Sequence, residues 1–205
     1  MASILQKAAE AAGSIFGVRT AKEPKYEIID RIANIEIRRY APRIAAETSV
    51  EAKDGGNARN EAFSRLAGYI FGGNRNKRSI AMTAPVANEK GRQIAMTAPV
   101  EMDEPDNVLT MRFFLPSEIT AENAPAPSDL RVRVVQVPEE TIATLTFSGL
   151  WKGRHIKEKE AELLAGLKSS RWQATGRPFA QLYDPPFTLP FLRKNEAAIR
   201  VAKAA

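Results

Sequence analysis

The segment that decides the fold is "YEIIDRIANIEIRRYAPRIAAETSVEA", residues 26–52, in which apolar and polar side chains alternate along three short runs. Period-two alternation is typical of strands with one buried face, because successive side chains of a strand point to opposite sides of the sheet. The runs are Tyr26–Asp30, Ile35–Tyr40 and Arg43–Val50, separated by Asn34 and by Ala41-Pro42. The segment therefore predicts three consecutive strands near the start of the fold.

A helix and further strands follow, and a similar order then repeats. Asp54–Asn57 offers capping side chains for a helix that we expect to run to about Phe71, where Gly72-Gly73-Asn74 ends it. The other predicted elements are strands at 108–115, 130–137, 141–149, 178–187 and 195–202 and a helix at about 152–168. This order predicts an N-terminal arm at 1–23 and a single antiparallel α+β domain at 24–205, with pseudo-equivalent halves at about 24–116 and 128–203.

The heptapeptide Ile-Ala-Met-Thr-Ala-Pro-Val occurs twice, at 80–86 and 94–100. We expect the copies to form the two arms of a hairpin with Gly91 in its turn, each ending at a proline that cannot donate to a strand ladder. Their methionines, Met82 and Met96, could fill the core, line a pocket for a flat apolar ligand, or ligate iron or copper as thioethers. These three uses stay open because the sequence does not fix the register of the hairpin.

The composition argues against several functional classes. The 205 residues include no cysteine, which removes disulfides, thiolate metal sites and cysteine nucleophiles. His155 is the only histidine, so neither a His-rich metal site nor a Ser-His-Asp triad is expected. The net charge of +6 suits an anionic partner, but the cations are scattered and match no nucleic-acid-binding motif. We therefore expect no nucleic-acid partner.

The N-terminal arm reads neither as a secretory signal nor as a membrane span, because it lacks a basic start and a long apolar run. Its apolar residues could line one face of a short helix: Ile4, Leu5, Ala8, Ala12, Ile15 and Phe16. A frayed or loosely docked arm and a helix on a membrane surface are the two interpretations. We expect a cytoplasmic protein without stable membrane insertion.

Several stretches, in order from about Tyr26 to Val201, resemble the SOUL/haem-binding-protein family in its bacterial form. They are "YIFGGNRNKRSIAMTAPV", the second "IAMTAPV", "MRFFLPSE", "APAPSDLRVRVV", "TIATLTFSGLW" and "LYDPPFTLPFLRKNEAAI". The resemblance implies a distorted antiparallel β-barrel of two βαββ-type halves with a helix on each, related to the gyrase-inhibitor-like effector-binding fold. It also implies binding of haem and other tetrapyrroles, without established catalysis for most members.

The family does not bind haem in a single way. Some animal members resemble a simple apolar cleft on the first helix with basic residues near the propionates, and others are thought to ligate iron through a histidine in an "EIRHY" stretch. This sequence reads Glu36-Ile37-Arg38-Arg39-Tyr40, so Arg39 takes the place of that histidine. Tight, histidine-ligated haem is therefore not expected.

The candidate haem site combines apolar residues of the first helix with nearby cations. The predicted cofactor-binding residues are Arg59, Phe63, Arg65, Leu66, Ala67 and Ile70, with Met82 or Met96 opposite. The arginines, and the loop cations Arg75, Lys77 and Arg78, could pair with propionates because guanidinium groups favour carboxylates. The plainer alternative is that the apolar residues pack the helix on the sheet and that the cations are solvated.

Three side chains could ligate iron in principle. His155 is the only imidazole and is the predicted metal ligand, although its place in "WKGRHIKEKE" suits an exposed position near the start of the second helix. Tyr40 and Tyr69 could supply phenolate oxygens, although both also suit core or rim positions. None of the three belongs to a metal-binding motif.

The residues and the resemblance together favour a non-catalytic protein that buffers or carries weakly bound haem or another tetrapyrrole. It would hold the ring in an apolar cleft and its propionates on arginine and lysine. One alternative is an effector- or protein-binding module of the same fold with another apolar ligand. The other alternative is a tetrapyrrole-modifying enzyme, and the lack of a compact group of acid–base residues argues against it.

Overall fold

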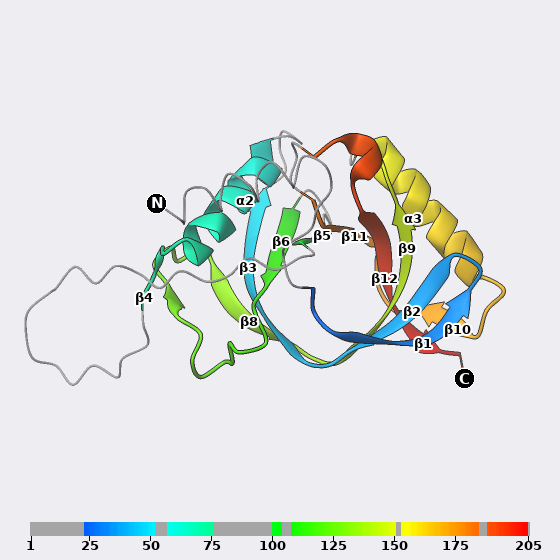
Figure 1. Ribbon diagram of the computed structural model, residues 1–205, viewed down its shortest axis with the longest axis horizontal. Helices are drawn as coiled ribbons and strands as arrows, with labels where there is room; N and C mark the ends of the chain where they lie inside the picture. The colour runs from blue at the N-terminus through cyan, green and yellow to red at the C-terminus, as the bar shows by residue number, and fades with distance from the viewer. Residues whose placement is uncertain are drawn as a thin grey trace, which may run out of the picture. The chain divides into compact units, whose positions relative to one another are not determined.

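The computed structural model describes residues 23–51, 57–75, 100–103, 108–150, 153–184 and 188–204. The chain divides into two compact units, which we name after the helix that each contains (Figure 1). The α3 unit comprises residues 1–41, 98–101 and 139–205, and the α2 unit comprises residues 42–97 and 102–138.

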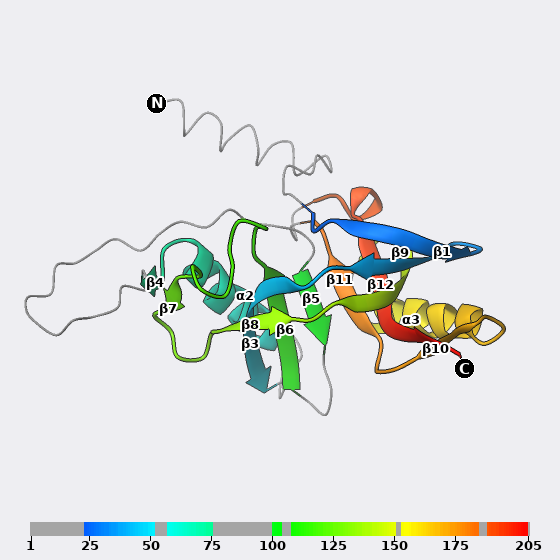
Figure 2. The same cartoon turned by 90° about the horizontal axis from the view of Figure 1, so that it is seen from below.

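Antiparallel strands and helix α3 make up the α3 unit. Its elements are β1 (Tyr26–Ile32), β2 (Ile35–Tyr40), β9 (Glu140–Phe147), α3 (Gly153–Leu167), β10 (Trp172–Ala174), β11 (Phe179–Leu182), the 3₁₀ turn η1 (Pro190–Leu192) and β12 (Asn195–Lys203). The strand order is β1–β2–β9–β12–β11, and β10 also pairs with β12. Both views show α3 alongside β9 and β12 (Figures 1 and 2).

The alternation of side chains shows which face of this sheet α3 covers. Ile35 of β2 lies opposite Leu145 of β9, so the two share a face with Ile37, and all three are at most 3% exposed. Helix α3 packs closely there, since a Cβ atom on Gly166 would collide with Cδ1 of Ile35. Arg38 follows Ile37 in the strand and therefore points to the opposite face, which the helix does not cover.

The α2 unit combines helix α2 with a second set of antiparallel strands. Its elements are β3 (Arg43–Glu51), α2 (Asn57–Ile70), β4 (Asn74–Arg75), β6 (Val108–Phe114), β7 (Ala126–Pro127) and β8 (Arg133–Val137), while β5 (Val100–Asp103) spans the boundary between the units. Strand β3 lies between β6 and β8, and β4 pairs with β7. Helix α2 packs against β3 and β6.

Helix α2 ends close to Phe71, as the glycines after that residue lead one to expect. Gly72 adopts a φ of 115°, a left-handed conformation that glycine reaches without strain. The amide of Gly73 then donates to the carbonyl of Gly68 at 2.7 Å, which is the six-to-one bond of a Schellman motif. The side chain of Asn74 closes the turn by donating to the carbonyl of Tyr69 at 2.7 Å.

The structure confirms the α+β class, the antiparallel strands and the two predicted helices. The three strands of the opening segment are β1, β2 and β3, with ends within two residues of the predicted ones. The short strands β4, β7 and β10 and the turn η1 were not predicted. Of the doubled heptapeptide, only Val100 lies within the described residues. No helix in the described part of the chain is long and apolar enough to cross a bilayer.

Each of the two units combines strands from the N-terminal and C-terminal halves of the chain. Strand β2 pairs with β9 from the C-terminal half, and β8 from that half pairs with β3. Alternation fixes which face of a strand is buried, but it does not choose the strand's partner. The domain at 24–205 and its pseudo-equivalent halves at about 24–116 and 128–203 stay predictions.

Candidate functional site

Helix α2 has one face buried against the sheet. Its buried residues are Ala58, Ala62, Leu66, Tyr69 and Ile70. Leu66 and Ile70, two of the predicted ligand contacts, are 0% and 1% exposed. These two side chains therefore pack the helix on its sheet.

A second apolar line on α2 faces solvent. Phe63, Ala67 and Phe71 are spaced four residues apart, which places them side by side along the helix surface, and we name them the α2 stripe. Phe63 is 41% exposed and Phe71 is 58% exposed. The Phe71 amide donates to the Ala67 carbonyl at 2.9 Å, so Phe71 continues the helical turn beyond Ile70. The stripe offers an apolar surface on an ordered backbone.

The ring of Phe63 is held in place although one side of it remains in water. It packs edge-on against Phe113 of β6, with ring centroids 5.4 Å apart and an interplanar angle of 65°. Aromatic pairs favour this arrangement because the positive edge of one ring meets the negative face of the other. A flat apolar ligand would therefore meet a pre-oriented ring.

The two predicted propionate partners on α2 have different surroundings. Arg59 lies four residues before Phe63 and is half-buried, so it extends the line of the α2 stripe. The guanidinium of Arg65 instead pairs with Glu61 and donates from Nη1 to the Ser49 carbonyl at 3.1 Å. Arg65 thus helps to hold α2 on β3.

Tyr69 lies on the buried face of α2, and its hydroxyl keeps its proton. Its hydroxyl donates to the Pro125 carbonyl at 2.9 Å, and the residue is 2% exposed. Burial raises the pKa of Tyr69 to about 12, because a phenolate would lose its hydration. At neutral pH this residue is therefore a protonated hydrogen-bond donor rather than an anionic iron ligand.

The raised pKa of Tyr69 predicts an alkaline loss of stability. The unfolded phenol ionises near pH 10 and the folded one near pH 12, so this stabilisation is complete below pH 10 and disappears as the pH rises to about 12. Relative to Tyr69→Phe, the free energy of unfolding of the unaltered chain should fall by about 2 kcal/mol across that interval. Urea unfolding of both proteins measures this difference, and parallel pH curves would contradict it.

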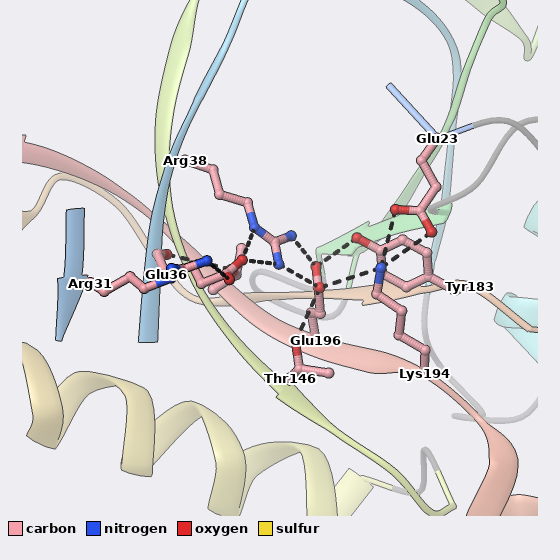
Figure 3. A network of polar contacts seen from close by, with 9 residues as sticks. Glu23, Arg31, Glu36, Arg38, Thr146, Tyr183, Lys194 and Glu196 are labelled. Carbon is pink, nitrogen blue, oxygen red and sulfur yellow. Dashed lines mark hydrogen bonds and ion pairs between the residues drawn. The ribbon is translucent and has the colours of Figure 1, made fainter. Parts of the chain in front are cut away.

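A buried ion-pair network lies on the face of the α3-unit sheet opposite α3 (Figure 3). Glu196, which is 0% exposed, accepts one hydrogen bond from each terminal nitrogen of Arg38, both at 3.0 Å. The same carboxylate accepts from the hydroxyl of Tyr183 at 2.6 Å and from Oγ1 of Thr146 at 3.2 Å. Nε of Arg38 donates to Glu36 at 2.9 Å.

The groups of this network are already bound to one another. Burial beside Glu196 raises the pKa of Tyr183 far above its usual range, so its proton stays on the hydroxyl. Burial opposes the charge of Arg38, but the adjacent Glu196 prevails and raises the pKa of the guanidinium. Both oxygens of Glu196 have their donors. This arrangement suits a stabilising role better than proton transfer to a substrate.

Arg39 and His155 lie in the α3 unit, where each contacts other residues of that unit. Arg39 has a half-exposed side chain that pairs with Glu27 at 3.5 Å. Nε2 of His155 lies 3.3 Å from the carbonyl oxygen of Ser148, and its ring packs edge-on against Phe147 with centroids 5.2 Å apart. The contacts of His155 join the start of α3 to the end of β9.

The predicted site residues do not form one surface. Phe63 and Ala67 lie on the α2 stripe, Leu66 and Ile70 point to the sheet, and His155 belongs to the other unit. Met82, Met96, Lys77 and Arg78 lie outside the described residues, while Arg75 is exposed on β4.

Phe71 was missed because it directly precedes the glycines that end the helix. Its four-residue spacing from Ala67 is the signal that could have found it. Among the described residues, no group of three or more histidine, aspartate or glutamate side chains could hold a metal ion. Apolar contact with the α2 stripe is therefore the interaction with a flat ligand that the described residues support best.

The sequence profile of the SOUL heme-binding protein matches residues 21–200, so the chain belongs to that family. Mouse (Mus musculus) heme-binding protein 2 is 30% identical over 174 residues, which cover 80% of each chain. Bovine (Bos taurus) heme-binding protein 1 is 26% identical over 153 residues, which cover 74% of each chain. These matches confirm the family that the sequence motifs indicate.

Solved structures share the fold at low sequence identity. The C-terminal domain of EcmrR superposes with a TM-score of 0.60 at 10% identity, covering 87% of this chain and 99% of that domain. A protein from Listeria innocua described as a hydrolase superposes with a TM-score of 0.52 at 13% identity, covering 89% of this chain and 94% of its own. At such identities these likenesses establish the α+β fold alone.

Proposed function

We propose that this chain binds haem and related tetrapyrroles reversibly on the α2 stripe, without a bond between the iron and the protein. The exposure of Phe63 and Phe71 on an otherwise well-packed helix carries this proposal. The family and the mouse and bovine relatives are named for heme binding. A flat, largely apolar macrocycle matches a row of exposed apolar side chains, and this match requires no metal ligand.

Apolar contact supplies enough free energy for useful binding. Burial of several hundred Å² of ring and protein surface contributes on the order of 10 kcal/mol before costs. Association and side-chain ordering take back a large part of this amount. The expected dissociation constant is therefore micromolar, which suits exchangeable haem.

The cations near the stripe would pair with the propionates. Arg59 is the first choice because it continues the line of Phe63, and Arg75 is a second, exposed cation of the same unit. Arg65 contributes its charge to the local potential while its guanidinium holds the helix. Leu66 and Ile70 support the stripe from beneath, and a facing wall from Met82 or Met96 stays a prediction.

We further propose that binding here is non-catalytic and serves haem buffering or transport in the cytoplasm. The buried ionisable groups of the Glu196–Arg38 network are bound to one another, so they are not poised to exchange protons with a ring. The alternative is an effector- or protein-binding module of the same fold that binds another apolar ligand in place of haem. A Soret shift with equimolar hemin and quenching of tryptophan fluorescence support haem binding, and the absence of both would favour that alternative.

His155 should matter little for haem affinity. Its Nε2 lies within hydrogen-bonding distance of the Ser148 carbonyl and its ring packs on Phe147, so a haem iron would have to compete with both contacts. We expect His155→Ala to change hemin affinity by less than about tenfold, which corresponds to about 1.4 kcal/mol. Absorption spectra of the two proteins with hemin measure this, and loss of the bound spectrum in the variant would refute binding without iron ligation.

A further inference from the structure

The α3 unit carries an exposed apolar patch that the proposed haem site does not use. Leu150, Leu189 and Phe191 are 45%, 36% and 70% exposed. The amide of Gly149 donates to the Pro190 carbonyl at 2.8 Å, which brings the loop after β9 and the turn η1 together. We name these three side chains the η1 patch. A Cβ atom on Gly149 would lie 3.5 Å from Nε2 of His155, so the loop after β9 also lies beside the first turn of α3.

Turn η1 presents Phe191 on an ordered backbone. The amides of Leu192 and Arg193 donate to the carbonyls of Leu189 and Pro190 at 2.9 and 3.2 Å. Nε of Arg193, a buried side chain, donates to the Thr188 carbonyl at 2.7 Å. A large aromatic side chain held in this way and left in water indicates a surface that another apolar group covers.

The chain enters the described structure at Glu23, which contacts a residue just beyond turn η1. Nζ of Lys194 lies 3.1 and 3.2 Å from the two carboxylate oxygens of Glu23, and Lys194 follows Phe191 by three residues. Residues 1–22 therefore join the described chain at a residue that contacts the segment following η1. The apolar face predicted for this arm has helical spacing and ends in Ile15 and Phe16, which precede Glu23 by eight and seven residues.

We infer that the N-terminal arm docks on the η1 patch of its own chain through the apolar face that ends in Ile15 and Phe16. Seven residues of helix span about 10 Å and an extended linker of the same length spans about twice that distance, so the arm is long enough to extend from Glu23 toward the patch. The tether supplies a high effective concentration, which favours this segment over a separate partner. Docking of the arm is independent of haem binding on α2.

Hydrogen exchange in the full chain tests the docking. Segments 147–150 and 188–193 should exchange at least about threefold faster in the double variant Ile15→Asp/Phe16→Asp than in the unaltered chain. The matched control Gln6→Asp/Ser14→Asp adds the same charge away from the apolar face and should leave exchange unchanged. Equal exchange in all three proteins would overturn the inference.

The same experiment separates the competing occupants. Protection that rises with protein concentration would assign the patch to a second copy of the chain, and protection that requires anionic phospholipid vesicles would assign it to a membrane surface. Either result would overturn docking of the arm. Because the sequence has no cysteine, a Phe16→Cys/Phe191→Cys pair gives a direct second measurement. Dilute oxidation should cross-link this pair within one chain, and a Phe16→Cys/Leu130→Cys pair that cross-links equally well would contradict it.

Discussion

Replacing Phe63 by aspartate lowers the affinity for hemin by at least about thirtyfold. Phe63 leaves 41% of its surface in water, roughly 80 Å² of a phenylalanine, and bound haem would cover that area. At about 25 cal/mol per Å² the loss is about 2 kcal/mol, or a factor of about thirty. The new carboxylate also repels the haem propionates, which lowers the affinity further. Titration of the Soret band measures the change.

Leu130→Asp is the matched control for Phe63→Asp. Leu130 is 95% exposed in the same unit, so its replacement makes the same apolar-to-acidic change away from the α2 stripe. Hemin affinity should stay within twofold of the unaltered chain. Since Phe63 also packs on Phe113, circular dichroism should first establish that the Phe63 variant is folded. A folded Phe63→Asp protein with unchanged affinity would show that haem does not lie on this stripe.

Breaking the buried pair between Arg38 and Glu196 destabilises the fold by about 3–5 kcal/mol. The side chains are 4% and 0% exposed and share two hydrogen bonds, so either partner left alone is a buried charge without its main counter-ion. Arg38→Met and Glu196→Met should each lower the free energy of unfolding by this amount, seen as a lower urea midpoint with an unchanged slope of the transition.

The double variant Arg38→Met/Glu196→Met tests the reason for that loss. Removing both charges leaves no buried charge without its partner. The free energy of unfolding of the double variant should therefore fall by clearly less than the sum of the decreases in the two single variants. Glu158→Gln breaks the exposed pair with Arg154 and should have no measurable effect, because solvent screens that pair. Additive losses in the double variant would show that the two side chains act independently.

The elements of the fold were largely predictable from local pattern. The alternation of residues 26–52 fixed β1, β2 and β3, because each strand has one apolar face. The end of α2 followed from Gly72 and Gly73, which satisfy the last carbonyls of the helix. Strand pairing across the chain was not predictable, since β8 joins β3 through contacts that no local pattern encodes. The three-residue strand β10 is too short to show a period.

The candidate site was predictable in part. The apolar spacing of α2 identified the helix, but it could not show that Leu66 points to the sheet while Phe63 keeps one side in water. That distinction depends on which side of the helix meets β3 and β6. The pairing of Arg38 with Glu196 spans 158 residues, and hydrophobic pattern carries no information about such a contact. A strand that alternates Glu36, Arg38 and Tyr40 is nevertheless a signal that its second face is polar.

A comparison of hemin with metal-free protoporphyrin IX tests most directly whether haem binds without a bond to iron. Both ligands present the same ring and propionates to the α2 stripe, so their dissociation constants should be micromolar and agree within about tenfold. Absorption and fluorescence titrations of the full-length chain measure both constants. Hemin bound more than a hundredfold tighter than protoporphyrin IX would reveal an iron–protein bond and contradict the proposal, as would the absence of binding by either ligand.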